Sequence, residues 1–271
     1  MNKVNIVAEI AQGYEGKPEL AGLLTTAALR SGADIIKYQL VYADELVTPD
    51  YKHHALFSSL EMDLKVWKGL RDRIRKENKL MYVDLYGQKS LEVALEIGVD
   101  GVKLSTTDFY NDQLREDALQ SFSNILISIG GIPISDVDRL VDELVKQNLN
   151  NRKQITLLYG FQAEPTPLEQ NNLAKIRRYK ERYSQFEIGF MDHSDGAHEE
   201  GILLGLLALG FGVSMIEKHI TLDRELEIED YVSGLAPSKF IEFVRVIRKF
   251  EAAIGSNSLD ITALEEEYRR G

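Results

Sequence analysis

The sequence predicts an α/β protein that folds as a single (β/α)8 TIM barrel. Its 271 residues match the ~250 residues that one such barrel needs. Eight short apolar runs rich in β-branched residues alternate with longer amphipathic segments. Strands buried on both faces with helices between them indicate a parallel sheet, and eight such units favour closure into a barrel. An open, doubly wound sheet is the alternative.

The elements follow one another along the chain in a regular order. The runs expected as strands are residues 4–8, 35–37, 80–83, 101–104, 124–128, 154–158, 187–190 and 213–217. Helical periodicity occurs at residues 20–30, 64–76, 90–97, 137–148, 173–183, 199–209 and 237–254. We therefore expect a catalytic barrel domain over residues 1–255 and a polar tail, 256–271, that forms a short helix.

Glycines mark several of the predicted boundaries. Gly32 and Gly98 follow helical segments, where glycine takes the left-handed conformation at little cost. Gly130 and Gly131 follow the fifth expected strand. They fit either a tight turn or a close approach of the backbone to a phosphate group.

Composition excludes several classes of protein. Lys and Arg number 32 against 43 Asp and Glu, a net charge of −11, which disfavours a nucleic-acid partner. Cysteine is absent, so neither disulfides nor thiolate metal sites can form. The N-terminal residues lack the pattern of a signal peptide, and the apolar stretch 201–215 is too short to span a bilayer. We expect a cytoplasmic enzyme of small molecules, with no membrane partner.

The connection between residues 40 and 60 is too long for an ordinary loop between a strand and a helix. Loops of this length often act as lids or binding loops. It contains His53 and His54, which we interpret as a pair of solvated side chains rather than as ligands.

Two lysines stand where strands are expected, Lys37 in the second and Lys103 in the fourth. A buried lysine is costly unless it is paired. Two ammonium groups at one barrel mouth suit a phosphate or carboxylate, and a Schiff-base role is a second possibility. The structural alternative is a pair of salt bridges with Glu9 or Glu217.

Two histidines, His193 and His219, end the seventh and eighth expected strands. Imidazoles from neighbouring strand ends can share one divalent metal ion, with Glu9, Asp84 or Glu217 completing or orienting the ligands. Without thiolates, Mn²⁺ or Mg²⁺ suits such a site. Further polar residues at the strand ends are Gln12, Glu15, Gln39, Thr106, Ser128, Gln162, Glu164 and Asp192.

At these positions the chain resembles the sialic acid synthase family, the N-acetylneuraminate synthases and their legionaminate and pseudaminate relatives. The resemblance runs from residue 8 to about 255. The matching segments, in order, are 8–16 (AEIAQGYEG), 32–39 (GADIIKYQ), 103–106 (KLST), 157–167 (LLYGFQAEPTP), 191–196 (MDHSDG) and 216–221 (IEKHIT).

The resemblance implies a TIM-barrel synthase of bacterial surface carbohydrates. Such an enzyme condenses phosphoenolpyruvate with a sugar aldehyde such as N-acetylmannosamine and releases phosphate. It implies that Mn²⁺ or Mg²⁺ binds His193 and His219, and that the enzyme is a homodimer. The residues that it implies for the donor are Lys37, Lys103, Thr106 and Ser128. Glu15 would be a base near the metal-bound water, and Asp230 would bind the acceptor.

The sequence also departs from the family pattern. Asp84 replaces a threonine that contacts phosphate, Gln162 an asparagine, Glu164 a tyrosine and Met191 a serine, while Gly13-Tyr14 replaces an Asn-His pair. A carboxylate at position 84 repels phosphate unless it binds a metal ion or a lysine. These changes fit a less charged donor, or a cationic or hydroxyl-rich acceptor.

Three readings of the function therefore stay open. The first is the phosphoenolpyruvate-dependent synthase. The second is a metal-dependent aldolase, lyase or other carbohydrate enzyme that does not use phosphoenolpyruvate, and the third is a non-catalytic barrel. The family's barrel is followed by an antifreeze-like domain that helps to bind the acceptor, and the sequence stops at Gly271 before one, which leaves the acceptor and the dimer open.

Overall fold

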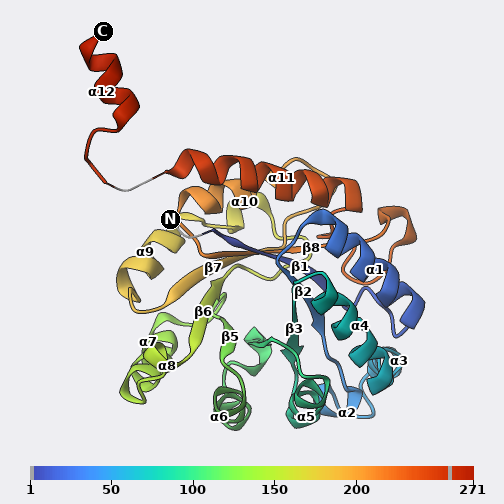
Figure 1. Cartoon of the computed structure of the whole chain (residues 1–271). Helices are drawn as coiled ribbons and strands as arrows, with labels where there is room; N and C mark the ends of the chain where they lie inside the picture. The colour runs from blue at the N-terminus through green and yellow to red at the C-terminus, as the bar shows by residue number, and fades with distance from the viewer. Residues whose placement is uncertain (1–2, 256–257) are drawn as a thin grey trace.

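Eight parallel strands close into a barrel in the computed structural model, which describes residues 3–255 and 258–271 (Figure 1). Each strand pairs with its neighbours in the sequence, and β1 pairs with β8 to close the ring. The strands are β1 Asn5–Ala11, β2 Ile35–Gln39, β3 Leu80–Leu85, β4 Gly101–Leu104, β5 Asn124–Ser128, β6 Gln154–Tyr159, β7 Glu187–Asp192 and β8 Met215–His219. The predicted TIM barrel is confirmed.

Helices surround the barrel, and most occupy the segments that the periodicity predicts. The longer ones are α1 Pro18–Ser31, α4 Leu64–Lys76, α5 Gln88–Ile97, α6 Asp112–Ser121, α7 Ile134–Lys146, α9 Ala174–Arg182, α10 Glu200–Gly210 and α11 Pro237–Ile254. The short ones are α2 Ala43–Leu46, α3 His54–Ser59 and α8 Leu149–Arg152, with 3₁₀ turns η1 Thr106–Asp108, η2 Leu168–Gln170 and η3 Arg224–Leu226. In the part of the chain that is described, no helix is both long and apolar enough to cross a membrane.

Helix α6 is absent from the sequence-based prediction. It buries only Leu114, Ala118 and Leu119, so its apolar periodicity is weak. Its start is set by the Asn111 side chain, which accepts a hydrogen bond from the Leu114 backbone N–H at 3.2 Å. A capping residue of this kind satisfies a backbone donor that the helix leaves free.

An apolar layer of side chains fills the barrel interior beneath the mouth. Its side chains are Val7, Ile35, Tyr82, Leu126, Leu158, Met191 and Met215. Strand β4 contributes no side chain here, because a Cβ atom on Gly101 would lie 2.5 Å from the Tyr82 ring. The layer is packed, so a ligand at the C-terminal mouth has a closed floor.

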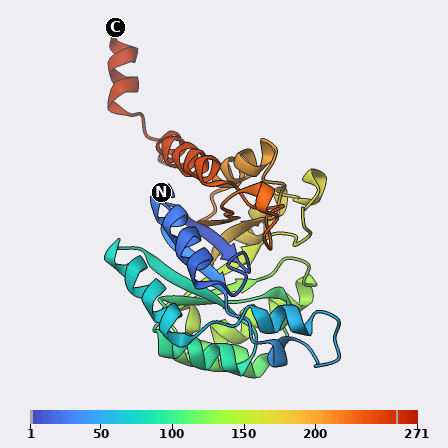
Figure 2. The ribbon, with the colours of Figure 1, turned by 90° about the vertical axis from the view of Figure 1, so that its right-hand side faces the viewer.

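Helix α11 joins the two ends of the barrel domain. Its Glu251 carboxylate accepts a hydrogen bond from the Val4 backbone N–H at 2.6 Å, and Arg248 donates to the Val4 carbonyl at 2.8 Å. Arg248 also pairs with Asp34, at the start of β2. In both ribbon views helix α12, Ala263–Arg270, projects away from the barrel (Figures 1 and 2). The tail thus forms the predicted short helix.

Candidate functional site

On most strands the inward-facing side chain two residues beyond the apolar layer is polar. On β1 and β2, Val7 is followed by Glu9 and Ile35 by Lys37. On β3 and β4, Tyr82 is followed by Asp84, and Gly101 by Lys103. Alternate residues of a strand face the same side, so these polar side chains form one layer above the apolar floor. This layer lies at the carboxyl ends of the strands, where barrel enzymes hold their substrates.

Five of these residues form what we call the lysine–carboxylate cluster: Glu9, Lys37, Asp84, Lys103 and Glu217. Lys37 Nζ pairs with Glu9, and lies 2.8 Å from Asp84 Oδ1 and 3.5 Å from Glu217 Oε2. Lys103 Nζ lies 2.6 Å from Glu217 Oε1 and 3.8 Å from Asp84 Oδ2. Asp84 and Glu217 therefore each bridge both ammonium groups, as the structural alternative for the lysines anticipated.

The cluster holds three carboxyl groups against two ammonium groups, and all five side chains are buried. Burial raises the pKa of Glu9 to about 8 despite the opposing effect of Lys37. Burial would also raise the pKa of Glu217, but Lys103 and Lys37 outweigh it and lower that pKa to about 2. Burial of three carboxyl groups beside two ammonium groups thus favours the protonated form of Glu9.

Lys37 is a poor candidate for a Schiff base. Burial alone lowers the pKa of a lysine, but here Asp84, Glu217 and Glu9 outweigh it and raise the pKa of Lys37 well above its ordinary value. A nucleophilic amine must be deprotonated, which requires the opposite shift. The environment of Lys37 favours charge pairing instead.

The rings of His193 and His219 lie side by side, with centroids 5.1 Å apart. The Nδ1 atom of each ring is buried and has no hydrogen-bond partner. Burial, with Lys103 next, lowers the pKa of His193 to about 3, and burial with His193 lowers the pKa of His219 well below its ordinary value. Both imidazoles are therefore neutral at physiological pH.

A divalent ion fits this pair of histidines. Metals bind the neutral imidazole, and each ring offers a buried nitrogen with no other partner. No cluster of three or more His, Asp or Glu side chains in residues 3–255 and 258–271 is spaced to hold a metal. A bound ion would therefore take its remaining ligands from water or substrate, which leaves positions open for chemistry.

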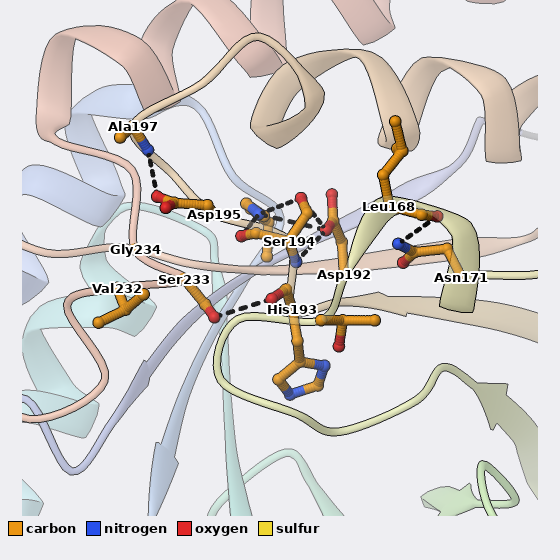
Figure 3. Close-up of polar contacts among 12 residues, drawn as sticks. Leu168, Asn171, Asp192, His193, Ser194, Asp195, Ala197, Val232, Ser233 and Gly234 are labelled. Atoms are coloured by element: carbon orange, nitrogen blue, oxygen red, sulfur yellow. Dashed lines mark hydrogen bonds and ion pairs between the residues drawn. The ribbon is translucent and has the colours of Figure 1, made fainter.

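The end of β7 fixes the position of His193 (Figure 3). Its carbonyl accepts hydrogen bonds from Ser233 Oγ at 2.9 Å and from the Thr166 backbone N–H at 2.8 Å. The figure shows its ring pointing away from the polar group formed by Asp192 and Ser194. Loops after β6, β7 and β8 thus hold the backbone while the ring stays free.

Asp192 lies on the opposite face of its strand, because it pairs in register with Lys218 while Met191 pairs with Glu217. Its Oδ1 atom accepts from Lys218 Nζ at 3.2 Å and from Ser194 Oγ at 2.6 Å. Both Asp192 and Lys218 are buried between the barrel and its helices. The structure therefore does not bring Asp192 to the mouth, and the predicted substrate contact has no geometric support.

The rim of the mouth joins the loops after β1, β2 and β8. Gln12 donates a side-chain hydrogen bond to Gln39 Oε1 at 2.7 Å, and its backbone N–H donates to Asp230 Oδ2 at 3.1 Å. Burial raises the pKa of Asp230 to about 7, and the carboxylates of Glu164 and Glu229 add to this effect. The charge of Lys37 opposes this rise in the pKa of Asp230.

Thr106 and Ser128 lie at the ends of β4 and β5. Thr106 Oγ1 is buried and has no hydrogen-bond partner, so it is free to bind a ligand. Ser128 Oγ lies 3.5 Å from the sulfur of Met191 across the barrel interior. The methionine that replaces a family serine thus meets one of the residues predicted to hold the donor.

Glu15 and Gln162 are not part of the lysine–carboxylate cluster or of the histidine pair. Glu15 Oε2 pairs with Lys17, an exposed residue, at 2.7 Å. Gln162 is exposed on the loop after β6, as is Glu164, which meets the site only through its effect on Asp230. Roles for these three residues stay predictions.

One residue near the site, Tyr86, was not identified from the sequence. Tyr86 lies two positions beyond Asp84 and is buried, and its pKa is raised by burial and by Asp84. The period-two spacing from Tyr82 through Asp84 could have identified it. Tyr14, which replaces a family histidine, donates a hydrogen bond to the Gln39 carbonyl at 3.0 Å and packs edge-on against Trp67. It supports the end of β2 rather than facing a ligand.

The sequence left open whether Gly130 and Gly131 form a tight turn or let the backbone approach a phosphate group. The packing of Gly130 and Gly160, at the ends of β5 and β6, bears on this choice. A Cβ atom on Gly130 would lie 1.7 Å from the Gly160 carbonyl oxygen, and one on Gly160 would lie 2.2 Å from the Met191 carbonyl oxygen. Close packing of neighbouring strand ends therefore accounts for both residues. Gly131 has φ +77°, which favours a turn.

A cavity of about 510 Å³ lies at the other end of the barrel. Its lining includes residues at the N-terminal ends of strands, among them Asn5, Asn124, Gln154 and Glu187. In this fold the N-terminal face serves stability, whereas chemistry occupies the C-terminal face. The candidate site therefore stays at the mouth that holds the lysines and histidines.

Comparison with known proteins gives one family match, to the NeuB family over residues 24–258. An N,N'-diacetyllegionaminic acid synthase of Campylobacter jejuni is 26% identical, over 94% of this chain and 78% of that protein. The spore coat polysaccharide biosynthesis protein SpsE of Bacillus subtilis is 28% identical, over 98% of this chain and 76% of that protein.

Solved structures give the same result. The crystal structure of an N-acetylneuraminic acid (sialic acid) synthetase from Leptospira borgpetersenii, in complex with citrate, superposes with a TM-score of 0.90. The two chains are 28% identical, and the match covers 99% of this chain and 91% of that one.

Proposed function

Because the chain belongs to the NeuB family, we propose that it is a nonulosonic-acid-type synthase that joins phosphoenolpyruvate to a sugar aldehyde. In this reaction C3 of the donor bonds to the aldehyde carbon, water adds to C2, and inorganic phosphate leaves. The reaction is balanced, because one donor molecule, one aldehyde and one water molecule give one keto acid and one inorganic phosphate. The proposal includes a role in surface carbohydrate biosynthesis, and cytoplasmic location and a homodimer remain predictions.

One observation supports the proposal above others: two lysines and two neutral histidines, distant in sequence, converge at one mouth. Lys103 and His193 are close enough for the lysine to lower the pKa of the imidazole. Lys37 and Lys103 would bind the anionic groups of the donor, and Thr106 would add a hydrogen bond. Fixing both reactants in one orientation removes much of the entropic barrier to their union.

The proposed cofactor is Mn²⁺ or Mg²⁺, held by His193 and His219. A bound divalent ion would supply Lewis acidity at the aldehyde oxygen. Asp230, at the rim, would accept a hydrogen bond from a hydroxyl group of the acceptor.

Release of phosphate tests the proposal. The protein is incubated with phosphoenolpyruvate, Mn²⁺ and a set of aldoses that includes N-acetylmannosamine, and inorganic phosphate and the keto-acid product are measured together. We expect phosphate release that depends on both the aldose and the metal. Release without an aldose, or none with any aldose, contradicts the proposal.

A second function follows from the carboxylates of the cluster. Lys37 and Lys103 are already matched by Glu9, Asp84 and Glu217, which favours a metal-dependent aldolase or lyase that uses free pyruvate. Condensation of pyruvate with an aldose, without any phosphate release, would support this function over the first.

A further inference from the structure

Asp84 lies between the two lysines that the proposed function assigns to the anionic groups of the donor. Its Oδ1 atom lies 2.8 Å from Lys37 Nζ and its Oδ2 atom 3.8 Å from Lys103 Nζ. The side chain is 1% exposed, so no water shell screens these charges. A carboxylate that spans two ammonium groups resembles the bound form of an external carboxylate or phosphate.

The charges of the cluster leave no surplus for a further anion. Whether or not Glu9 carries a proton, the carboxylates equal or exceed the two ammonium groups. A phosphate monoester brings a charge of about −1.5 to −2, and the donor's carboxylate adds another. Such a ligand must displace a carboxylate of the protein or bear its repulsion in a buried site.

Of the three carboxyl groups in the cluster, Asp84 is the one that an anionic ligand can displace. Glu217 makes the shorter contact with Lys103, 2.6 Å against 3.8 Å, and Glu9 makes the shorter contact with Lys37. Asp84 is thus the closest carboxyl group to neither lysine, although it lies nearer to Lys37 than Glu217 does, 2.8 Å against 3.5 Å. Loss of Asp84 from the cluster leaves two carboxyl groups for two ammonium groups.

We propose that Asp84 is a specificity-determining residue, a tethered counter-ion that competes with the donor's anionic group and selects donors of lower negative charge. The inference rests on the proposed function only in taking the donor to be phosphoenolpyruvate or pyruvate. Competition weakens a dianionic group more than a single carboxylate. Asp84 therefore sets the ratio of affinities for phosphorylated and unphosphorylated three-carbon acids.

Binding titrations test this without any turnover. Inorganic phosphate, phosphoenolpyruvate and pyruvate are titrated into the full chain and into Asp84→Asn, in buffer that contains Mg²⁺, by calorimetry. We expect Asp84→Asn to bind phosphate and phosphoenolpyruvate at least tenfold more tightly, about 1.4 kcal/mol. Pyruvate affinity should change less than the other two.

Two further variants make the test specific. Asp84→Thr removes the same charge with a different shape and should give the same order of affinities. Asp44→Asn removes one negative charge from a side chain that is 84% exposed and should change none of them. A melting curve of each variant shows that it is folded.

The outcomes separate this inference from the proposed function. If phosphate binds no more tightly to folded Asp84→Asn and Asp84→Thr than to the parent chain, the inference is overturned. If phosphate binding tightens but phosphoenolpyruvate yields no aldose-dependent phosphate release, the inference stands and the proposed function fails.

Discussion

The charged side chain of Lys37 is held inside the barrel by several ion pairs. It is fully buried and contacts three carboxylates, Glu9, Asp84 and Glu217. Removing one partner from a buried ionic group leaves charges that neither water nor protein compensates. The balance of the cluster therefore matters more for stability than the number of its ion pairs.

Lys37→Met should destabilise the protein by about 3–5 kcal/mol, because three buried carboxyl groups then have a single ammonium group, that of Lys103, to balance their charge. Urea unfolding followed by circular dichroism measures the change. Lys65→Met, on the exposed surface of α4, is the control and should stay within about 0.5 kcal/mol of the parent chain. A loss below 1 kcal/mol for Lys37→Met would show that the cluster rearranges freely.

His219→Ala should abolish binding of Mn²⁺, because only two imidazoles are available to hold the ion. Elemental analysis of dialysed protein gives the stoichiometry of bound metal. His53→Ala, at an exposed histidine, should keep the stoichiometry of the parent chain. Unchanged metal content in His219→Ala would remove His219 from the site.

Asp230 should make stability fall as the pH rises. Its pKa is about 7 in the folded protein against 3.8 ordinarily, so between these values the folded state binds more protons than the unfolded state. By linkage, the contribution of this group to stability is full below about pH 4 and is lost progressively as the pH rises to about 7. Asp230→Asn removes that loss.

The measurement compares melting temperatures of the parent chain and Asp230→Asn at pH 5 and pH 8. We expect the difference between the two proteins to grow in favour of the variant at the higher pH. An equal shift of both proteins between the two values of pH would show that Asp230 titrates normally.

At the scale of single elements, helix α10 is pressed against α11 through a glycine. A Cβ atom on Gly205 would lie 2.5 Å from the Phe243 ring. By contrast, Gly69 on α4 has nothing within 4 Å of its added Cβ atom. The two glycines therefore respond to the same substitution in opposite directions.

Gly205→Ala should cost about 1–3 kcal/mol because the helices must move apart. Gly69→Ala should gain about 0.5–1 kcal/mol, because alanine loses less backbone freedom in a helix. Chemical denaturation of both variants checks the pair. Equal effects from the two substitutions would contradict the close packing of α10 on α11.

The sequence was most informative about the elements with strong apolar patterns. All eight strands were predicted within a few residues, since parallel strands in a barrel are buried on both faces. Helix α6 was missed because its sequence, DQLREDALQS, is polar apart from three buried side chains.

A glycine also marks the boundary after α10. Gly212 follows this helix and takes the left-handed conformation, with φ +77°.

The direction in which side chains point along a strand also decided which parts of the site could be predicted from the sequence. Alternation along strands places Lys37, Asp84, Lys103 and Glu217 on one layer, so their convergence follows from the fold. The same alternation turns Asp192 away, which a search for polar strand ends overlooks. Which carboxylate bridges which lysine depends on side-chain packing that no sequence pattern encodes.

Across the whole molecule, the barrel is complete without its tail. Within residues 262–271 the hydrogen bonds and ion pairs join only residues of that segment, such as Arg269 and Glu266. Helix α12 is too short to be stable alone in water. Its first backbone N–H groups are capped by its own residues Thr262 and Glu265.

A chain that ends at Gly255 should melt within about 2 °C of the full-length chain. Differential scanning calorimetry makes the comparison, and a lower melting temperature would show that the tail packs on the barrel. Size-exclusion chromatography of both chains at equal concentration tests in addition whether the tail contributes to the predicted homodimer.

The pairing of β1 with β8 governs how the protein can be made. During synthesis on the ribosome, β1 is made long before its partner β8, which ends at His219, so one edge of β1 stays unpaired. Until β8 is made, the nascent sheet has two open edges, which can pair with strands of other chains. Newly made protein is therefore most prone to aggregation late in translation, just before the last strand leaves the exit tunnel.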